Sequence, residues 1–297
     1  MILVAGSTGT LGEMICRLLA GKGIQVRALV RPTSNKETVK SLAGLGAEIA
    51  EGDVRDSASL ARACKGAQTV LSTISSMPTR YVAGENDIAS VDSHGVKELI
   101  GAARAAGVER FIFMSFTADN LFPLREAKRE AERILMSSGM TYTVLRASFF
   151  METWLSPMVG FDYEKGTARI LGTGENPVSF ISVKDVAHFA VASLDTPAAI
   201  DAVVPLGGPE AISPNAVVKV FEEIGGRAFT VETMTAAAIA AQQKEATDPM
   251  QQSFAGLMLA LSGGDAVAMT NTTRDFGVRQ TSVRDYAKEV LPQTVRR

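Results

Sequence analysis

The sequence predicts an α/β fold in which a doubly wound parallel β-sheet carries helices on both faces. Two observations predict it: short apolar runs alternate with stretches of helical periodicity, and the first apolar run passes through a glycine turn directly into a helical pattern. A length of 297 residues with 46% hydrophobic and 21% charged residues provides enough apolar surface for a sizeable core.

The first half of the chain follows this alternation in order. Apolar residues at 2–5 predict a buried strand, and those from Leu11 to Leu19 recur at helical spacing until Gly21 and Gly23 end the helix. Further strands are predicted at 25–30, 47–50, 69–74, 110–114 and 141–145, and further helices around Val39 and Leu42 and at 59–64, 87–106 and 124–137. Nearly continuous apolar strands between helices are typical of a parallel sheet that is covered on both faces.

Beyond Phe149 the periodicity weakens and Gly and Pro punctuate the chain, which predicts loops and shorter elements. Helices are expected at 183–194 and 213–224, and the stretch 234–261, rich in Ala, Met and Gln, is expected to form a helical lid or a partner surface. We therefore expect one domain over residues 1–150 and a smaller α/β part over 151–297, interleaved with the first.

The glycine turn is the sequence "GSTGTLG" between the first strand and the first helix. Amides at a helix N-terminus favour a pyrophosphate, and small residues let the backbone approach it closely. A P-loop is disfavoured because Glu13 and Met14 follow, where Lys and Ser or Thr would stand. The turn predicts a dinucleotide site, with seven candidate contacts: Gly6, Ser7, Thr8, Gly9, Thr10, Leu11 and Gly12.

The end of the second predicted strand distinguishes the two nicotinamide dinucleotides. An acidic residue there would accept a hydrogen bond from the ribose 2′-hydroxyl of NAD(H), whereas an arginine would bind the 2′-phosphate of NADP(H). The chain has Arg31 there, with Ser34 and Lys36 in the same loop. This favours NADP(H); the alternative is that Arg31 is a solvated residue at the strand end.

Charge and composition exclude several other functions. A formal net charge of -2 provides no basic surface for nucleic acid or an acidic membrane. No segment reaches the roughly 18 apolar residues of a membrane span, and no basic leader opens the chain, so we expect a soluble cytoplasmic protein. Cys16 and Cys64 lie at apolar helix positions that suit reduced thiols in a core. His94 and His188 lack further ligands at metal-binding spacing, so no metal is expected.

The chain resembles the atypical extended short-chain dehydrogenases/reductases, in particular the NmrA-like branch that is similar to isoflavone reductases and quinone reductases. The resemblance rests on the sequences "GSTGTLG", "ALVR", "EGDVRDSASL", "GVKELIGAARAAGVERFIFMS", "YTVLRASFFMETW" and "PVSFISVKDVAHFAVASL". It implies that residues 1–150 form a Rossmann domain that binds NAD(P) and that residues 151–297 bind the substrate. It also implies that Asp53 and Val54 flank the adenine and that Thr73, Ile74 and Ser75 line the path of the ribose and nicotinamide.

The resemblance implies a catalytic Tyr-x-x-x-Lys pair as well, and here the chain departs from the family. The corresponding residues are Leu124 and Lys128, and leucine cannot donate a proton. Lys128 is expected to bind the nicotinamide ribose or to stabilise developing negative charge; the alternative is a solvent-facing lysine on a charged helix. Ser115, at the carboxyl end of the fifth strand, is expected to open onto the nicotinamide.

The missing acid favours an acceptor that needs little protonation. Hydride addition to a quinone gives a phenolate-like anion, whose conjugate acid has a pKa of about 10, whereas a ketone gives an alkoxide nearer the value of about 15.7 for water. Aromatic residues after the sixth strand suit a flat apolar substrate, with Phe149, Phe150 and Trp154 as candidates; the alternative is that they are core. Tyr81 and Arg80 are further candidates for closing over the site or donating a proton.

The leading hypothesis is therefore an NADPH-dependent reductase of a flat conjugated small molecule, such as a quinone or an enone. A second hypothesis is a non-catalytic NADP(H) sensor or assembly factor, because the resemblance includes such regulators and the missing tyrosine suits them equally. A third is a sugar-nucleotide epimerase or dehydratase, which Leu124 disfavours. A homo-oligomer or a protein partner is expected to use the C-terminal half.

Overall fold

The computed structural model describes residues 1–77 and 81–291, and the chain divides into two compact units. The first unit contains Met1–Ser115, Pro123–Arg146 and Ala187–Val204. The second unit contains Phe116–Phe122, Ala147–Val186 and the chain from Pro205 onward. Each unit is thus assembled from three separate stretches of sequence. The assignment of cofactor binding to residues 1–150 and of substrate binding to 151–297 stays a prediction.

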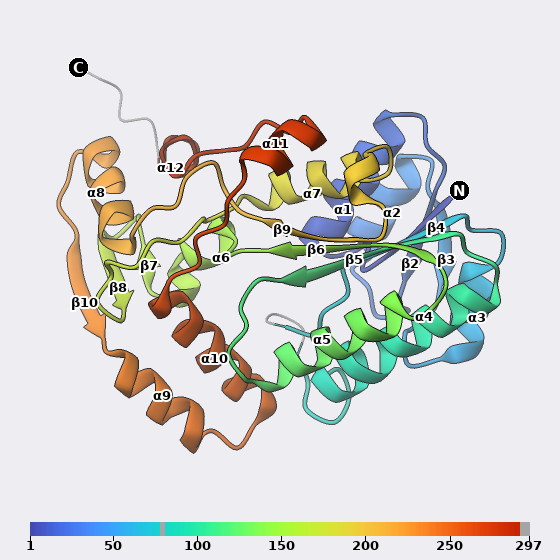
Figure 1. Cartoon of the computed structure of the whole chain (residues 1–297), viewed down its shortest axis with the longest axis horizontal. Coiled ribbons are helices and arrows are strands. Elements are labelled where there is room, and N and C mark those ends of the chain that lie inside the picture. The colour runs from blue at the N-terminus through green and yellow to red at the C-terminus, as the bar shows by residue number, and fades with distance from the viewer. Residues whose placement is uncertain (78–80, 292–297) are drawn as a thin grey trace. The chain divides into compact units, whose positions relative to one another are not determined.

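The first unit is built on a seven-stranded sheet with the order β3-β2-β1-β4-β5-β6-β9 (Figure 1). Its strands are β1 (Ile2–Ala5), β2 (Val26–Val30), β3 (Glu48–Glu51), β4 (Thr69–Ser72), β5 (Arg110–Phe116), β6 (Thr141–Ala147) and β9 (Ala202–Leu206). Strand β1 pairs in parallel with both β2 and β4, so that Ile2 lies between Val26 and Thr69. The strand order therefore reverses at β1, and ligands of such sheets bind at this switch point.

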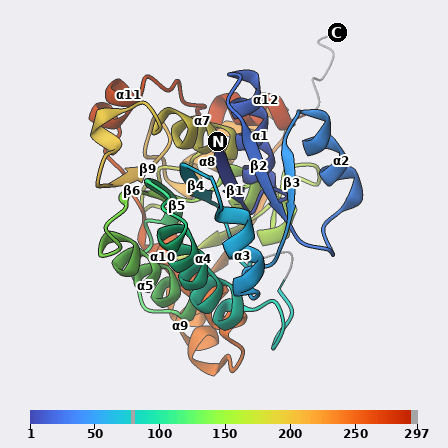
Figure 2. The same cartoon turned by 90° about the vertical axis from the view of Figure 1, so that its right-hand side faces the viewer.

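Helices cover both faces of this sheet. They are α1 (Thr10–Gly21), α2 (Lys36–Gly44), α3 (Ser57–Cys64), the π-helix η1 (Ile88–Gly95), α4 (Val96–Ala105), α5 (Pro123–Met136), α7 (Val183–Ala192) and the 3-10 turn η3 (Pro197–Ala199). Figure 2 shows α3, α4 and α5 on one face and α1 and α2 on the other. Fully buried Leu3, Phe111 and Leu99 belong to the core beneath α3–α5. The predicted doubly wound Rossmann-type α/β fold is confirmed.

The second unit has its own small sheet, in the order β10-β8-β7. Its strands are β7 (Phe161–Asp162), β8 (Thr167–Leu171) and β10 (Thr230–Met234). Its helices are α6 (Met151–Trp154), the 3-10 turn η2 (Pro157–Val159), α8 (Pro214–Gly225), α9 (Ala236–Glu245), α10 (Pro249–Gly263), α11 (Thr270–Phe276) and α12 (Val283–Val290). Phe161, Phe180 and Phe221 lie in its separate apolar core.

Two predicted helices differ from those observed. The helix expected over 87–106 begins as the π-helix η1 and continues as α4, and π-helical segments are frequent at functional sites. The stretch 234–261 is interrupted because Asp248 caps the amides of Met250 and Gln251 and Pro249 opens a new helix. Within the described residues, no helix is long and apolar enough to span a lipid bilayer.

Candidate cofactor-binding site

The glycine turn after β1 is shaped by contacts of the backbone with itself. Gly6 has a φ of +86°, and a Cβ on it would lie 2.5 Å from Thr73 Oγ1. A Cβ on Gly12, in the first turn of α1, would lie 2.2 Å from the carbonyl oxygen of Gly6. Gly12 is therefore required for packing the start of α1 against the turn, and Gly6 for packing the turn against the segment after β4, whether or not a ligand binds.

Gly9 is different because no protein atom forces it to be glycine. A Cβ there would meet only the carbonyl oxygen of Gly6, at 3.4 Å, and the residue's φ of -84° is open to any amino acid. Gly9 is the N-cap of α1 and provides no side chain to cap the first amides of that helix. The open space and the uncapped amides together are what a diphosphate needs.

A pocket of about 130 Å³ opens beside Gly9 in the first unit. Predicted residues that line it are Gly6, Thr8, Gly9, Arg31, Asp53, Val54, Thr73, Ile74 and Ser75. Leu29, Gly52, Asn86 and Val91 also line it and were not predicted. Leu29 and Gly52 stand at strand ends that the sequence located, whereas no sequence pattern indicated Asn86 or Val91, which reach the pocket from the segment after β4.

Two polar pairs include residues that line this pocket. Arg31 Nη1 donates to Asn86 Oδ1 at 2.5 Å. Asp53 accepts two hydrogen bonds from the guanidinium of Arg55, at 2.9 and 2.7 Å. The side-chain hydrogen bonds from Arg55 lower the pKa of Asp53 against the opposing effect of burial. A fixed carboxylate and a guanidinium therefore line the same pocket, as expected for recognition of a ribose and its substituents.

Several other predicted cofactor residues do not line the pocket. Ser7 is fully buried and its Oγ donates to the carbonyl oxygen of Leu29 at 2.7 Å, which ties the turn to β2. Ser34 Oγ accepts from the amide of Arg31 at 3.0 Å and shapes the loop after β2. Thr10, Leu11, Gly12 and Lys36 are also outside the lining residues. Of these, Thr10 and Lys36 are exposed, whereas Leu11 and Gly12 are buried.

Lys128 lies inside the first unit, so the alternative of a solvent-facing lysine is wrong. Its side chain is 5% exposed, and Nζ donates to the carbonyl oxygen of Ile74 at 2.7 Å. Nζ also lies 3.3 Å from Asp92 Oδ1, and Asp92 Oδ2 accepts from the amide and the hydroxyl of Ser76. The buried ion pair thus connects α5 to the segment 74–76, part of which lines the pocket.

Ser115, on β5, belongs to a second buried cluster. This cluster is centred on Glu132, which follows Lys128 by one turn in α5. The Oγ of Ser115 donates to Glu132 Oε1 at 2.6 Å, and Glu132 also accepts hydrogen bonds from Arg129 and Arg146. Burial alone would raise the pKa of Glu132, but the hydrogen bonds from Arg146 and Ser115 and the charge of Arg129 hold it below the ordinary value. Glu132 is therefore an ionised carboxylate, and Ser115 directs its proton to that carboxylate.

The predicted substrate residues are placed differently from one another. In the second unit Phe149 is buried, Phe150 is half-buried at the N-cap of α6, and Trp154 is half-buried. The ring of Trp154 lies edge-on to Phe149, with centroids 5.0 Å apart. Tyr81 is half-buried in the first unit, and Arg80 lies outside the described residues. The role of these residues in substrate binding stays a prediction.

The two thiols are buried, as predicted. Burial raises the pKa of Cys16 to about 12 and that of Cys64 to about 11, so neither is a ready nucleophile. Among residues 1–77 and 81–291, no three His, Cys, Asp or Glu side chains are grouped so that they could hold a metal ion.

The first unit thus combines a doubly wound parallel sheet with a glycine turn at the start of α1. Residues 1–260 match the model of the NmrA-like family, and the chain belongs to that family, as the sequence resemblance predicted.

Proteins similar to this chain include both assembly factors and reductases. It is 31% identical over 229 residues to the photosystem II assembly factor Ycf39 of Cyanophora paradoxa, which covers 76% of this chain and 69% of the relative. It is 30% identical to the NAD(P)H azoreductase of Xenophilus azovorans, over 76% of this chain and 74% of the relative. The NADPH complex of the Escherichia coli quinone oxidoreductase QOR2 has the same fold, with a TM-score of 0.77, 22% identity and coverage of 98% and 99%.

The charge cluster around Glu132 generates a prediction about stability. Glu132→Gln leaves the guanidinium groups of Arg129 and Arg146 without their carboxylate, so we expect a loss of about 3–5 kcal/mol in the free energy of unfolding near pH 7. The folded-state pKa of Glu132 is lowered, so the wild-type advantage is complete above the unfolded value of about 4.3 and disappears as pH falls through the folded value. Urea unfolding at neutral and acid pH measures the difference.

Glu126→Gln is the matched control, because Glu126 is an exposed residue of the same helix. We expect that change to alter the free energy of unfolding by less than about 0.5 kcal/mol. A Glu132→Gln protein that is as stable as the control at neutral pH would contradict the assignment of an ionised, buried Glu132.

Proposed function

We propose that this protein is an NADPH-dependent reductase that transfers a hydride to a flat, conjugated acceptor such as a quinone or an enone. The observation that carries the proposal is Gly9, whose missing side chain no protein contact requires and whose position is the uncapped start of α1. A dinucleotide diphosphate explains both features. The QOR2 structure with bound NADPH supports this choice through its common fold, and the azoreductase supports it as a family relative.

The described residues fit NADPH along one pocket. Gly9 and Thr8 would hold the diphosphate, Arg31 the 2′-phosphate, and Thr73 to Ser75 the path toward the nicotinamide. Bound NADPH supplies the hydride. Lys128 holds the backbone of this segment through the carbonyl oxygen of Ile74 and contributes a cation in a region from which water is excluded.

The choice of acceptor follows from the residue that precedes Lys128 by one turn. Leu124 is 4% exposed and carries no exchangeable proton. Reduction of a quinone by NADPH consumes one proton and yields a hydroquinone and NADP⁺. The intermediate phenolate is a weak base, because its conjugate acid has a pKa of about 10. Such an anion is stable enough to form without a proton donor beside it and is protonated afterwards by water, so a dedicated acid is dispensable.

The direct experiment is oxidation of NADPH by a panel of acceptors that contains benzoquinones, naphthoquinones, enones and simple ketones. We expect turnover with quinones or enones and none with unconjugated ketones. Lys128→Met alone would leave Asp92 as an unpaired buried charge, so the informative variant is Lys128→Met with Asp92→Asn, which removes both charges together. We expect this pair to lower kcat by about 10²-fold or more while the protein stays folded.

If NADPH binds tightly and no acceptor in the panel oxidises it, the reductase proposal is wrong. Turnover of ketones at the rate of quinones would contradict the argument from Leu124, because an alkoxide product needs the acid that Leu124 does not provide. Unchanged kcat in the double variant would remove Lys128 from the catalytic machinery.

Gly9 provides the test of cofactor binding. Gly9→Val adds bulk where the structure leaves space for a ligand, so we expect NADPH affinity to fall by at least about tenfold, with little change in melting temperature. Isothermal titration calorimetry with NADPH measures the affinity. Gly21→Ala, in the same helix and with no atom within 4 Å of the added Cβ, is the control. Equal affinity in the Gly9→Val and control proteins would contradict the site.

Arg31 provides the test of cofactor choice. Arg31→Met removes the guanidinium that lines the pocket, so we expect NADPH to bind at least about tenfold more weakly while NADH binding stays unchanged. Lys36→Met removes an equal charge from an exposed position outside the pocket and should change neither affinity. A wild-type preference for NADH, or equal losses in both variants, would show that Arg31 does not read a 2′-phosphate.

A second candidate function is a non-catalytic NADP(H)-binding assembly or regulatory protein. It is favoured by the 31% identity to the photosystem II assembly factor Ycf39 and by the absence of the family's tyrosine at Leu124. In that case the cofactor would control binding of a protein partner, through the C-terminal half. The discriminating experiment is a pull-down with NADP⁺ or NADPH present, in which a partner that is retained with only one of the two supports this function over the reductase.

A further inference from the structure

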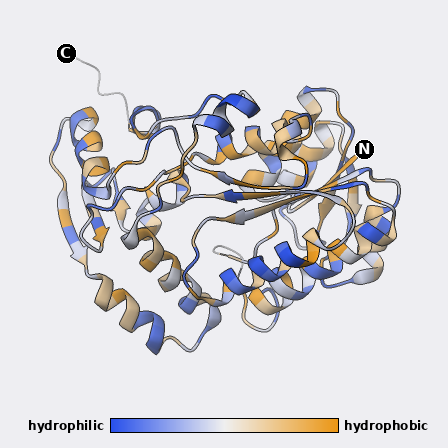
Figure 3. Ribbon diagram, in the orientation of Figure 1, coloured by the Kyte–Doolittle hydropathy of each residue, from blue (hydrophilic) through white to orange (hydrophobic). Residues whose placement is uncertain are grey.

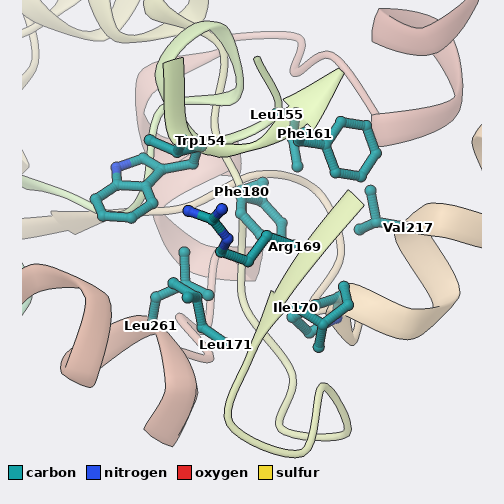
Figure 4. A pocket seen from close by; sticks show the side chains of 11 residues that line it. Trp154, Leu155, Phe161, Arg169, Ile170, Leu171, Phe180, Val217 and Leu261 are labelled. Atoms are coloured by element: carbon teal, nitrogen blue, oxygen red, sulfur yellow. The ribbon is translucent and has the colours of Figure 1, made fainter. Parts of the chain in front are cut away.

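The second unit contains a small pocket with one charged lining residue. Figure 4 shows Trp154, Phe161, Phe180, Leu171 and Leu261 around it, and Arg169 is the single polar side chain among the residues that line it. The pocket has a volume of about 30 Å³, enough for the end of a ligand but not for a ring system. Arg169 is exposed, so its guanidinium can meet a ligand at the solvent side of this apolar pocket.

Arg169 has no anionic partner within the described part of the chain. Its side chain makes no hydrogen bond or ion pair, although Glu232 lies opposite it in the ladder between β8 and β10. The guanidinium instead lies between the indole of Trp154 and the side chains of Phe180 and Leu261 (Figure 4). Gly160 leaves room for the side chain of Arg169, because a Cβ on Gly160 would lie 3.1 Å from the Cβ and 3.7 Å from the Nε of Arg169.

We propose that this pocket binds a short aliphatic carboxylate, with the hydrocarbon end among the apolar side chains and the carboxylate on Arg169. The narrow volume selects a methylene chain over an aromatic ring, and the planar guanidinium of Arg169 matches a carboxylate with two parallel hydrogen bonds. Because Arg169 is exposed, the anionic end stays at the solvent side and no charge is buried. The site lies wholly in the second unit and does not depend on the proposed reductase activity.

The chain provides its own reporter for this site. Trp154 is the single tryptophan of the sequence, and it lines the pocket between Phe149 and Phe254. Its fluorescence can therefore be followed while the whole 297-residue chain is titrated with hexanoate, or with hexanamide as the neutral analogue of the same length. No NADPH is added, so failure of the reductase proposal leaves this test unaffected, and the reverse also holds.

We expect hexanoate to change Trp154 emission saturably and hexanamide to bind at least about tenfold more weakly. Arg169→Gln should bind hexanoate about as weakly as hexanamide, and Arg169→Lys should retain part of the preference. Unchanged hexanamide binding in Arg169→Gln shows that the pocket is intact. Arg62→Gln, which removes an exposed arginine from α3 of the first unit, should behave as the wild type.

The proposal would be overturned by the absence of a saturable change with hexanoate, by equal affinity of the wild type for hexanoate and hexanamide, or by unchanged hexanoate affinity in Arg169→Gln. A loss in Arg62→Gln as large as that in Arg169→Gln would do so as well, because net charge and not the pocket would then determine binding.

Discussion

The close approach of Gly12 to the carbonyl oxygen of Gly6 is the contact on which the cofactor site depends. It brings the first turn of α1 against the end of β1, and this fixes where the helix amides point. Gly6 and Gly9 both line the pocket, but of these two only Gly9 is free of a close protein contact that requires glycine. Glycine spacing alone cannot separate these roles, because all three positions look equivalent in sequence.

A second constraint comes from the inner face of α5, where Lys128 and Glu132 are buried beside four apolar residues, Leu124, Ala127, Ala131 and Leu135. Figure 3 shows how strongly hydrophilic residues dominate this helix, yet Lys128 and Glu132 are almost completely buried. Each has its own counter-ions, Asp92 for Lys128 and two arginines for Glu132. A buried charge that loses its partner is costly. A shift of α5 along η1 and β6 would separate these pairs, and this disfavours other registers of packing. The positions of Lys128 and Ser115 are thereby fixed by electrostatics.

The sequence predicted the sheet of the first unit because strands buried on both faces give apolar runs that local patterns detect. Local patterns also located Gly9, in the turn after β1, and Arg31, at the end of β2, whereas Asp53 was implied by the family resemblance. Asn86 and Val91 could not be found that way, because they reach the pocket through a long connection whose path local patterns do not encode. Lys128 was ambiguous for a related reason: "REAKREAER" has the composition of a solvated helix, and its buried partners, Asp92 and the carbonyl oxygen of Ile74, are distant in sequence. Strands such as β10, exposed along most of its length, leave no apolar pattern at all.

The hydrogen bonds of the first unit bear on how a reduced product would obtain its proton. Ser115 directs its hydroxyl proton to Glu132, which is ionised, and so does not offer it elsewhere. Lys128 donates one N–H to the carbonyl oxygen of Ile74 and forms an ion pair with Asp92, so its protons are already engaged. With Leu124 unable to donate, none of these three groups is a free acid. If the proposed reduction takes place here, such a site would discriminate by the basicity of the product anion, because an alkoxide needs a strong donor at once whereas a phenolate is stable until water protonates it.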